Sequence, residues 1–321
     1  MTKEGHRTSR IIAVFLIVLA AALTSPASAD TIRIVTPFAA GGPADQLARL
    51  LAQELPARLR ADVVVDNRGG GGGAIGTEAV ARAAPDGKTL LLGSMGPHVI
   101  SATLRAPLAY DPVASFEPLV LIGSVPSVLV VSPQLGVKTL AELIARAKEA
   151  NLSYASAGPG TTMNIAGELL NAHGGIKVAH VPYRGAGPAI NDLLGGHVHV
   201  VIADFPVLLP LINNGTVRAL ALFGAERSAL LADVPTTREL GYPDMVMENW
   251  YGVFAPAGLP ADIHAATEKA ILDALKAPAV VERLKAGGLH GTLDSAAFKA
   301  RVVRDIAYWG PAIKQMGIKG E

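Results

Sequence analysis

The sequence predicts an α/β protein of two lobes with a cleft between them. Short β-branched segments alternate with amphipathic segments from Asp30 onward, which predicts parallel or mixed sheets covered by helices on both faces. A basic and then apolar leader precedes them, as in exported proteins. Two further strand-like segments, residues 128–131 and 250–255, each lie ahead of a proline, and we expect them to carry the chain between the lobes.

Residues 1–29 are expected to form a signal peptide. The start is basic, residues 11–23 are apolar, and residues 27–29 (Ala-Ser-Ala) form a small-residue cleavage signal. The apolar run is shorter than the ~20 residues that a membrane-spanning helix needs. An uncleaved anchor is the alternative. We therefore expect an exported chain whose mature part begins near Asp30.

Composition narrows the class of protein. Half of the 321 residues are hydrophobic, which is typical of a globular protein. The formal net charge is +1 and no basic run is interleaved with aromatic residues, so nucleic-acid binding is not expected. The chain has no cysteine, which excludes a lipid-modified cysteine. We expect a monomer that is free in the periplasm and not lipid-anchored.

The expected elements follow one another along the chain. Strands are expected over residues 32–35, 63–65, 89–92, 153–155, 178–181, 198–203 and 219–222. Helices are expected over residues 47–55, 75–83, 161–172, 260–276 and 295–315, after Pro188, and after the capping boxes at residues 139–142 and 236–239. With the two crossings, one lobe comprises residues 30–127 and 251–321, and the other comprises residues 128–250.

A Gly-rich loop between the first strand and the first helix is the strongest candidate for a ligand site. It runs from Pro37 to Asp45, and its site candidates are Phe38, Ala39, Ala40, Gly41, Gly42 and Asp45. Glycine lets a backbone approach a ligand closely, and the N–H groups of a helix start favour a carboxylate. An ordinary strand-to-helix turn, with Asp45 as a stabilising first-turn acid, is the alternative.

A second loop repeats this plan in the middle of the chain. It too joins a strand to a helix, and its candidates are Ser156, Ala157, Gly158, Gly160, Thr161 and Thr162. A threonine here can donate a hydroxyl to a ligand or simply cap the helix. Two such loops, one in each lobe, could hold one ligand from both sides.

Other motifs carry less weight. Residues 71–76 match G-x-G-x-x-G, but Asp86 lies in a turn rather than at a strand end, so a rim loop or tight turn is preferred to a dinucleotide site. His197 and His199 share a strand face without the further ligands that zinc requires. Ser94 lacks the G-x-S-x-G elbow of serine hydrolases, because Leu92 stands at the first glycine. We expect no enzymatic activity, no cofactor and no metal.

Long stretches of the chain resemble a known family. The stretches are IRIVTPFAAGGPADQLARLLAQEL, VVVDNRGGGGGAIGTEAVARAAPDGKTLLLG, YASAGPGTTMNIAGELL, HVPYRGAGPAINDLLGGHV and ADVPTTRELGYPDMVMENWYGVFAPAGLP. They are similar to the Bug family, the periplasmic receptors of tripartite tricarboxylate transporters, and cover nearly the whole mature chain. The resemblance implies the two-lobed periplasmic-binding-protein fold (type II-like), a small carboxylate ligand and a membrane permease as partner.

The resemblance also implies which residues hold the ligand. It places the two Gly-rich loops against the carboxylate, and adds cleft candidates at Ser94, Tyr183, Gly185, Ala186, Asp204 and Trp250. A sensor that presents its closed form to a histidine kinase is the alternative role. The chain departs from the family at Ala203, where an acid or Gly is common, at Val207 (Ser) and at Asn164 (His). These departures favour an aromatic or aliphatic acid over citrate.

Overall fold

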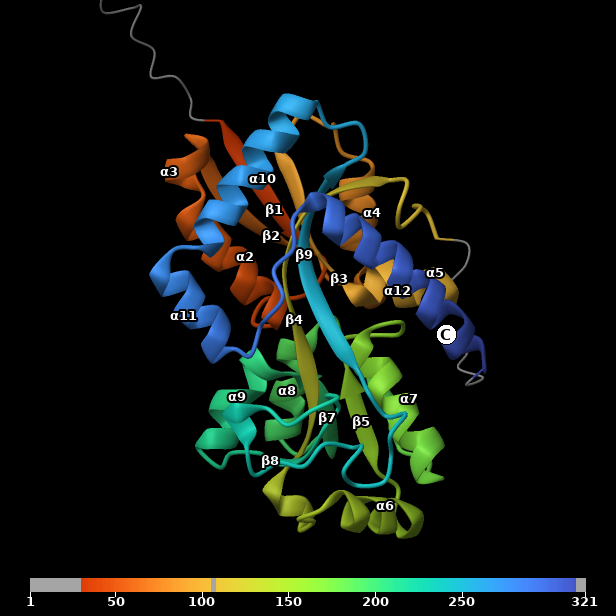
Figure 1. Ribbon diagram of the computed structural model, residues 1–321. Coiled ribbons are helices and arrows are strands. Elements are labelled where there is room, and N and C mark those ends of the chain that lie inside the picture. The colour runs from red at the N-terminus through yellow and green to blue at the C-terminus, as the bar shows by residue number, and fades with distance from the viewer. Residues whose placement is uncertain (1–29, 105–107, 316–321) are drawn as a thin grey trace, which may run out of the picture. The chain divides into compact units, whose positions relative to one another are not determined.

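The computed structural model describes residues 30–104 and 108–315 of the chain (Figure 1). The predicted signal peptide, residues 1–29, lies outside the described residues, and so does its cleavage site. The chain from Thr31 onward forms one unit by its internal contacts. Among the described residues, the helices are all too short or too polar to cross a membrane.

Three parallel strands with intervening helices open the fold. They are β1 (Thr31–Thr36), β2 (Asp62–Asn67) and β3 (Thr89–Ser94), and β1 pairs with both of the others. Helix α2 (Pro43–Glu54) follows β1, and helix α4 (Ala74–Ala81) leads from β2 to β3. The leucines of α2 are buried, as the spacing of its apolar residues predicts. The predicted alternation of strands and helices is therefore confirmed in this part.

The buried face of α4 differs from the predicted one. Ile75 is the first apolar residue of the helix predicted over residues 75–83 and was expected on its buried face, but its side chain is 58% exposed, so this placement is wrong. The helix instead buries Gly76, Thr77 and Val80. A Cβ at Gly76 would lie 2.7 Å from the Cα of Pro37, so the small residues face the chain and allow close packing.

Two long antiparallel strands, β4 (Phe116–Val131) and β9 (Glu248–Pro256), lie between the two halves of the sheet, which are the strands β1–β3 and the strands that follow β4 in the chain up to residue 222. They pair from Phe116↔Pro256 to Pro126↔Glu248. From Ser127 onward β4 pairs instead with β7 and β8. Figure 1 shows the two strands running side by side through the middle of the molecule. The two segments that were expected to connect the lobes, residues 128–131 and 250–255, thus belong to β4 and β9. These two strands pair with each other along most of their length.

A second group of strands completes the sheet. It contains β5 (Ser153–Ser156), β6 (Ala179–Pro182), β7 (Val200–Asp204) and β8 (Arg218–Leu222). The strand order is β2-β1-β3-β9-β4-β7-β5-β6, with β8 also pairing on β4. Because β5 pairs in parallel with β6 and β7 whereas β4 is antiparallel to β7, the sheet is mixed, as predicted.

The helices of this half begin where the strands end. They are α6 (Leu140–Glu149), α7 (Thr162–Gly174), α8 (Ala186–Leu194) and α9 (Phe205–Asn213). The helix start predicted at Thr139 is confirmed, because the Thr139 hydroxyl accepts a bond from the N–H of Glu142, while the Glu142 carboxylate accepts from the N–H of Lys138 rather than of Thr139. The second box forms reciprocal bonds between Thr236 and Glu239, but they close a turn and no helix follows.

Helices α10 (Ala261–Leu275), α11 (Pro278–Ala286) and α12 (Ser295–Gln315) follow β9. The sequence predicted α10 and α12 but not α11. A short π-helix (Gly96–Ile100) follows β3. It places the fully buried His98 against Phe254.

Candidate functional site

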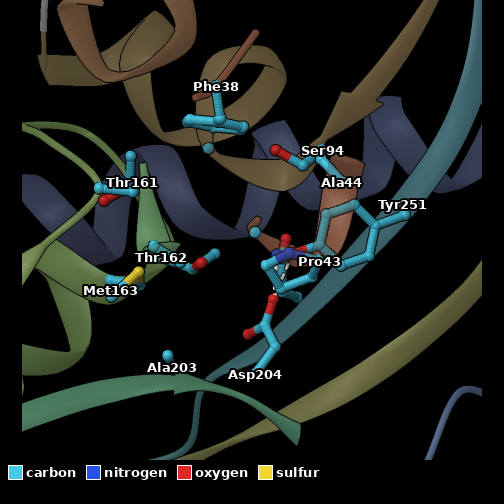
Figure 2. A pocket seen from close by; sticks show the side chains of 15 residues that line it. Phe38, Pro43, Ala44, Ser94, Thr161, Thr162, Met163, Ala203, Asp204 and Tyr251 are labelled. Carbon is cyan, nitrogen blue, oxygen red and sulfur yellow. Dashed lines mark hydrogen bonds between the residues drawn. The ribbon is translucent and has the colours of Figure 1, made fainter. Parts of the chain in front are cut away.

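One cavity brings together residues from both ends of the strand order (Figure 2). Its empty space is about 430 Å³, with the opening to solvent included. We call it the central cavity. Its lining residues are Phe38, Gly42, Pro43, Ala44, Ser94, Gly96, Ala157, Thr161, Thr162, Met163, Ala186, Ala203, Asp204, Asn249 and Tyr251.

The start of α2 forms one wall of the cavity. Gly42 is the N-cap and has no side-chain cap, and Pro43 and Ala44 occupy the first turn. Pro43 has no N–H, so Ala44 supplies the first-turn N–H at this wall, and helix geometry leaves that group without an acceptor inside the helix. The positive end of the helix dipole therefore faces the cavity at this point.

Asp45 does not line the cavity. Its side chain is instead bonded, at 3.0 Å each, to the N–H of Gly41, to Nδ2 of Asn67 and to Nε of Arg49. Burial acts to raise the pKa of Asp45, but hydrogen bonds from Arg49, Gly41 and Asn67 outweigh it and lower the pKa. Gly41 has a φ of 87°, which a side chain would strain. Asp45 therefore fixes the first loop in shape and makes no contact with the cavity.

The start of α7 forms the opposite wall. Thr161 is the N-cap: its hydroxyl donates to the carbonyl oxygen of Gly158 at 2.7 Å and accepts from the N–H of Asn164 at 3.3 Å. Thr162 and Met163 follow in the first turn and line the cavity. Because the Thr161 hydroxyl already makes two hydrogen bonds at the helix cap, we expect the hydroxyl of Thr162 to be the one that a ligand can contact.

The backbone of the second loop is held by Ser156. Its Oγ accepts from the N–H of Gly158 at 3.0 Å and lies 2.6 Å from Nε2 of His180. Ser156, Gly158 and Gly160 do not line the cavity, whereas Ala157 does. These three predicted residues therefore shape the loop.

The start of α8 is the third helix terminus at the cavity. Ala186 lines it, and Gly185 is the N-cap. Tyr183 does not line the cavity. Its hydroxyl instead donates to Asp192 at 2.5 Å. Burial, together with Asp192, raises the pKa of Tyr183 to about 12. The cavity thus receives the N-termini of α2, α7 and α8.

A buried carboxylate lies on one side of the cavity. Asp204, at the end of β7, accepts hydrogen bonds from Ser127 Oγ (3.2 Å), Asn249 Nδ2 (2.7 Å) and the Tyr251 hydroxyl (2.5 Å). Burial raises the pKa of Asp204, while the bonds from Tyr251, Asn249 and Ser127 act in the opposite direction. Burial and the neighbouring Asp204 also raise the pKa of Tyr251 well above its ordinary value, so the phenol remains a donor.

Trp250 points away from the cavity. Its side chain is fully buried, and Nε1 donates to Asp305 at 3.0 Å. The neighbours Asn249 and Tyr251 point the other way, because successive side chains of a strand alternate between faces. Trp250 was predicted to bind the ligand, but the aromatic residue of β9 that lines the cavity is its neighbour Tyr251.

Eight of the predicted site residues meet in the cavity, and ten do not. Those that line it are Phe38, Gly42, Ser94, Ala157, Thr161, Thr162, Ala186 and Asp204. Those that do not are Ala39, Ala40, Gly41, Asp45, Ser156, Gly158, Gly160, Tyr183, Gly185 and Trp250. The lining residues that were missed are Pro43, Ala44, Gly96, Met163, Ala203, Asn249 and Tyr251. Pro43, Ala44 and Met163 lie in the first turns of α2 and α7, the helices that follow the two predicted ligand loops.

Glycines outside the cavity bring the two halves of the molecule into backbone contact. The N–H of Ala39 donates to the carbonyl oxygen of Arg184 at 2.9 Å. A Cβ at Gly69 would lie 2.7 Å from the same oxygen, and one at Gly158 would lie 3.1 Å from the backbone of Gly72. The glycine run at residues 69–73 therefore packs closely against the chain around Phe38 and Arg184.

No group of three or more His, Cys, Asp or Glu residues is placed to hold a metal ion in residues 30–104 and 108–315. His199 instead accepts a hydrogen bond at Nδ1 from the N–H of Ser153 at 3.1 Å.

The sequence matches the model of the tripartite tricarboxylate transporter family receptor, TctC, over residues 47–318. It is 37% identical over 323 residues to Protein BugT of Bordetella pertussis. That match covers 97% of this chain and 98% of BugT.

Several solved structures are similar to the chain. The periplasmic binding protein BugD is 34% identical with a TM-score of 0.87, over 90% of this chain and 98% of BugD. A Rhodopseudomonas palustris protein with adipate is 32% identical with a TM-score of 0.85, over 90% and 98% of the two chains. MatC from Rhodopseudomonas palustris with bound malate is 33% identical with a TM-score of 0.83, over 88% and 98%. The predicted periplasmic-binding-protein fold is thereby confirmed.

Proposed function

Because the chain belongs to the tripartite tricarboxylate transporter receptor family, we propose that it captures a small carboxylate in the central cavity and delivers it to a membrane permease. The resemblance to the Bug family is confirmed by this membership. The family is one of solute-binding receptors, so the proposal involves binding and release without a chemical step.

The observation that carries the proposal is the meeting of three helix N-termini at one cavity. Among the described residues, those that line the cavity include no Lys, Arg or His. A carboxylate would therefore be held by main-chain N–H groups at the starts of α2, α7 and α8, with hydroxyls from Ser94 and Thr162. Such donors are stronger in a cavity that excludes water than on a surface.

The rest of the lining supports an acid with an apolar body. Phe38, Met163 and Ala203 contribute carbon and sulfur atoms to the wall (Figure 2). Ala203 stands where an acid or Gly was expected, and it does line the cavity, whereas Val207 and Asn164 do not. Citrate would bring three carboxylates to a wall without cations, so we expect it to bind more weakly than an aliphatic or aromatic acid.

Receptor function also requires export and closure. We propose that residues 1–29 direct export and that the mature protein is free in the periplasm. We further propose that residues 30–127 and 251–321 form one lobe and residues 128–250 the other, with β4 and β9 between them. A ligand held by loops from both halves would favour the closed form, which the permease would recognise.

A thermal-shift screen of the refolded mature protein tests the proposal. Refolding removes any copurified ligand. The panel would contain dicarboxylates and tricarboxylates, acidic amino acids, and aliphatic and aromatic monoacids. A ligand at about 100 times its Kd should add about 2.7 kcal/mol of stability and raise the melting temperature. If the folded protein shows no shift with any acid, the carboxylate assignment is wrong.

A further inference from the structure

Asp204 is the one acidic side chain among the residues that line the central cavity, and no cation accompanies it there. Its side chain is buried, and the three donors around it are Ser127, Asn249 and Tyr251. None of these donors is charged as a cation at neutral pH. Asp204 is also the N-cap of α9, so a ligand meets a carboxylate whose charge is balanced by neutral donors and a helix start, without a cation.

The three donors leave part of this carboxylate unused. A carboxylate offers about four acceptor positions, two on each oxygen. Asn249 and Tyr251 both bond to Oδ2, whereas Ser127 alone bonds to Oδ1. In Figure 2 the dashed lines reach one oxygen of Asp204, and the other oxygen is turned away from Tyr251. One acceptor position therefore remains, on Oδ1 of Asp204.

The charge balance of the cavity restricts what can occupy that position. A second carboxylate of a ligand placed there would face Asp204 without a cation between them, and like charges in a buried site repel. A hydroxyl or ammonium group would instead supply the missing hydrogen bond. The gain is a second hydrogen bond to Oδ1 beside the one from Ser127, and bonds to a charged acceptor are the stronger ones, so a ligand that lacks such a group would bind more weakly.

We propose that Oδ1 of Asp204 accepts a hydrogen bond from a hydroxyl or ammonium group of the ligand. The preferred ligand is then an acid that carries a hydrogen-bond donor as well as its carboxylate. This inference rests on the proposed function, because it assigns the carboxylate to the helix N-termini and the second polar group to Asp204.

Calorimetry with matched acids tests the proposal on the refolded protein. Each set keeps one carbon skeleton and changes one substituent: propionate, lactate and alanine; succinate, malate and aspartate; 3-phenylpropionate, phenyllactate and phenylalanine. In at least one set we expect the hydroxy or amino acid to bind at least about tenfold tighter than the unsubstituted acid. The hydroxy and amino members show which donor Asp204 takes.

Asp204→Asn tests the role of the residue itself. The Asn oxygen can still accept from Tyr251 and Asn249, which places its NH₂ group at the position of Oδ1 as a donor. The preference for donor-bearing acids should therefore disappear, and the unsubstituted acids should bind as well or better. Asp305→Asn is the control, because Asp305 is also a buried acid that accepts a hydrogen bond from an aromatic side chain of β9, but it pairs with Arg301 and lies outside the cavity. It should leave the preference unchanged.

The outcomes separate this inference from the proposed function. If the unsubstituted acids bind as tightly as their hydroxy and amino partners in every set, the role of Asp204 is wrong while carboxylate binding stands. The same conclusion follows if Asp204→Asn folds and keeps the wild-type preference. If no acid binds at all, the proposed function itself fails. Should Asp204→Asn not fold, the wild-type preference among matched acids still decides the question.

Discussion

The Ser101 hydroxyl donates a hydrogen bond of 3.4 Å to the carbonyl oxygen of Gly160, which joins the segment after β3 to the loop before α7. A Cβ at Gly160 would lie 2.7 Å from Oγ of Ser101. Neither residue lines the central cavity. The contact therefore acts on the cavity only through the spacing of the two segments that form its walls.

This contact predicts a loss of ligand affinity in Gly160→Ala. Gly160 and Gly215 both have a φ of 76°, so alanine strains the backbone at either position, but nothing lies within 4 Å of a Cβ at Gly215. Both variants should lose about 1 kcal/mol of stability. Only Gly160→Ala should also weaken binding, by about tenfold, as measured by calorimetry with the best acid from the screen. Equal affinities in the two variants would contradict this role for the contact.

The adjacent threonines of α7 should separate stability from binding. Thr161→Val removes the helix cap and should lower stability by about 1 kcal/mol. Thr162→Val should leave the melting temperature nearly unchanged but weaken carboxylate binding by about tenfold, because Thr162 lines the cavity and its hydroxyl is a proposed ligand donor. Thermal unfolding and calorimetry on both variants check the prediction, which fails if Thr162→Val binds like the wild type.

Neighbouring aromatic residues of β9 should likewise have opposite effects. Trp250→Phe removes the bond to Asp305 and should lower stability by about 1–3 kcal/mol without a change in affinity. Tyr251→Phe removes a donor from Asp204 and should weaken ligand binding. Denaturant unfolding and calorimetry measure the two effects. A larger loss of affinity in Trp250→Phe than in Tyr251→Phe would show that the side chains of β9 are assigned to the wrong faces.

His98 predicts that stability declines in mild acid. It is fully buried, and burial lowers its pKa from 6.5 to about 3, while its Nε2 has no hydrogen-bond partner. Between these two pKa values the unfolded chain binds a proton that the folded chain does not, so stability falls as the pH decreases through this range. At pH 5 the loss should be roughly 2 kcal/mol relative to neutral pH.

His98→Phe should remove this share of the pH dependence, because phenylalanine can keep the stacking on Phe254 and has no titratable group. Denaturant unfolding of the wild type and the variant at pH 5 and 7 measures the difference. His173→Gln, at an exposed position, is the control. An unchanged pH profile in His98→Phe would assign the acid sensitivity to other groups.

The alternation of strands and helices could be predicted because it depends on the spacing of apolar residues within each short segment. The first-turn residues of α2 and α7 were found in the same way, since Gly42 and Thr161 mark helix starts by their chemistry. The role of Asp45 could not be predicted from the neighbouring sequence. Its carboxylate holds the first loop instead of contacting a ligand partly because it accepts a hydrogen bond from Asn67, which lies on another strand.

The β9 contribution to the cavity was also beyond local reasoning. Whether Trp250 or Tyr251 faces the ligand depends on the pairing of β9 with β4, where Ser124 pairs with Trp250 and Gly123 with Tyr251 beside an irregular register. A shift of one residue would exchange the two faces. Asp204 acquires its partners Asn249 and Tyr251 through the same pairing, so its environment could be known only from the fold.

The helix starts at the cavity have a consequence for how such receptors diverge. A main-chain N–H survives every substitution except one to proline, so mutations at Phe38, Met163 or Ala203 can reshape the wall without deleting those donors. Recognition of the acid group and recognition of the rest of the molecule are thus inherited separately. With the proposed binding mode, a gene duplicate of this chain could change its preferred ligand through a few substitutions in the wall and retain its main-chain donors throughout.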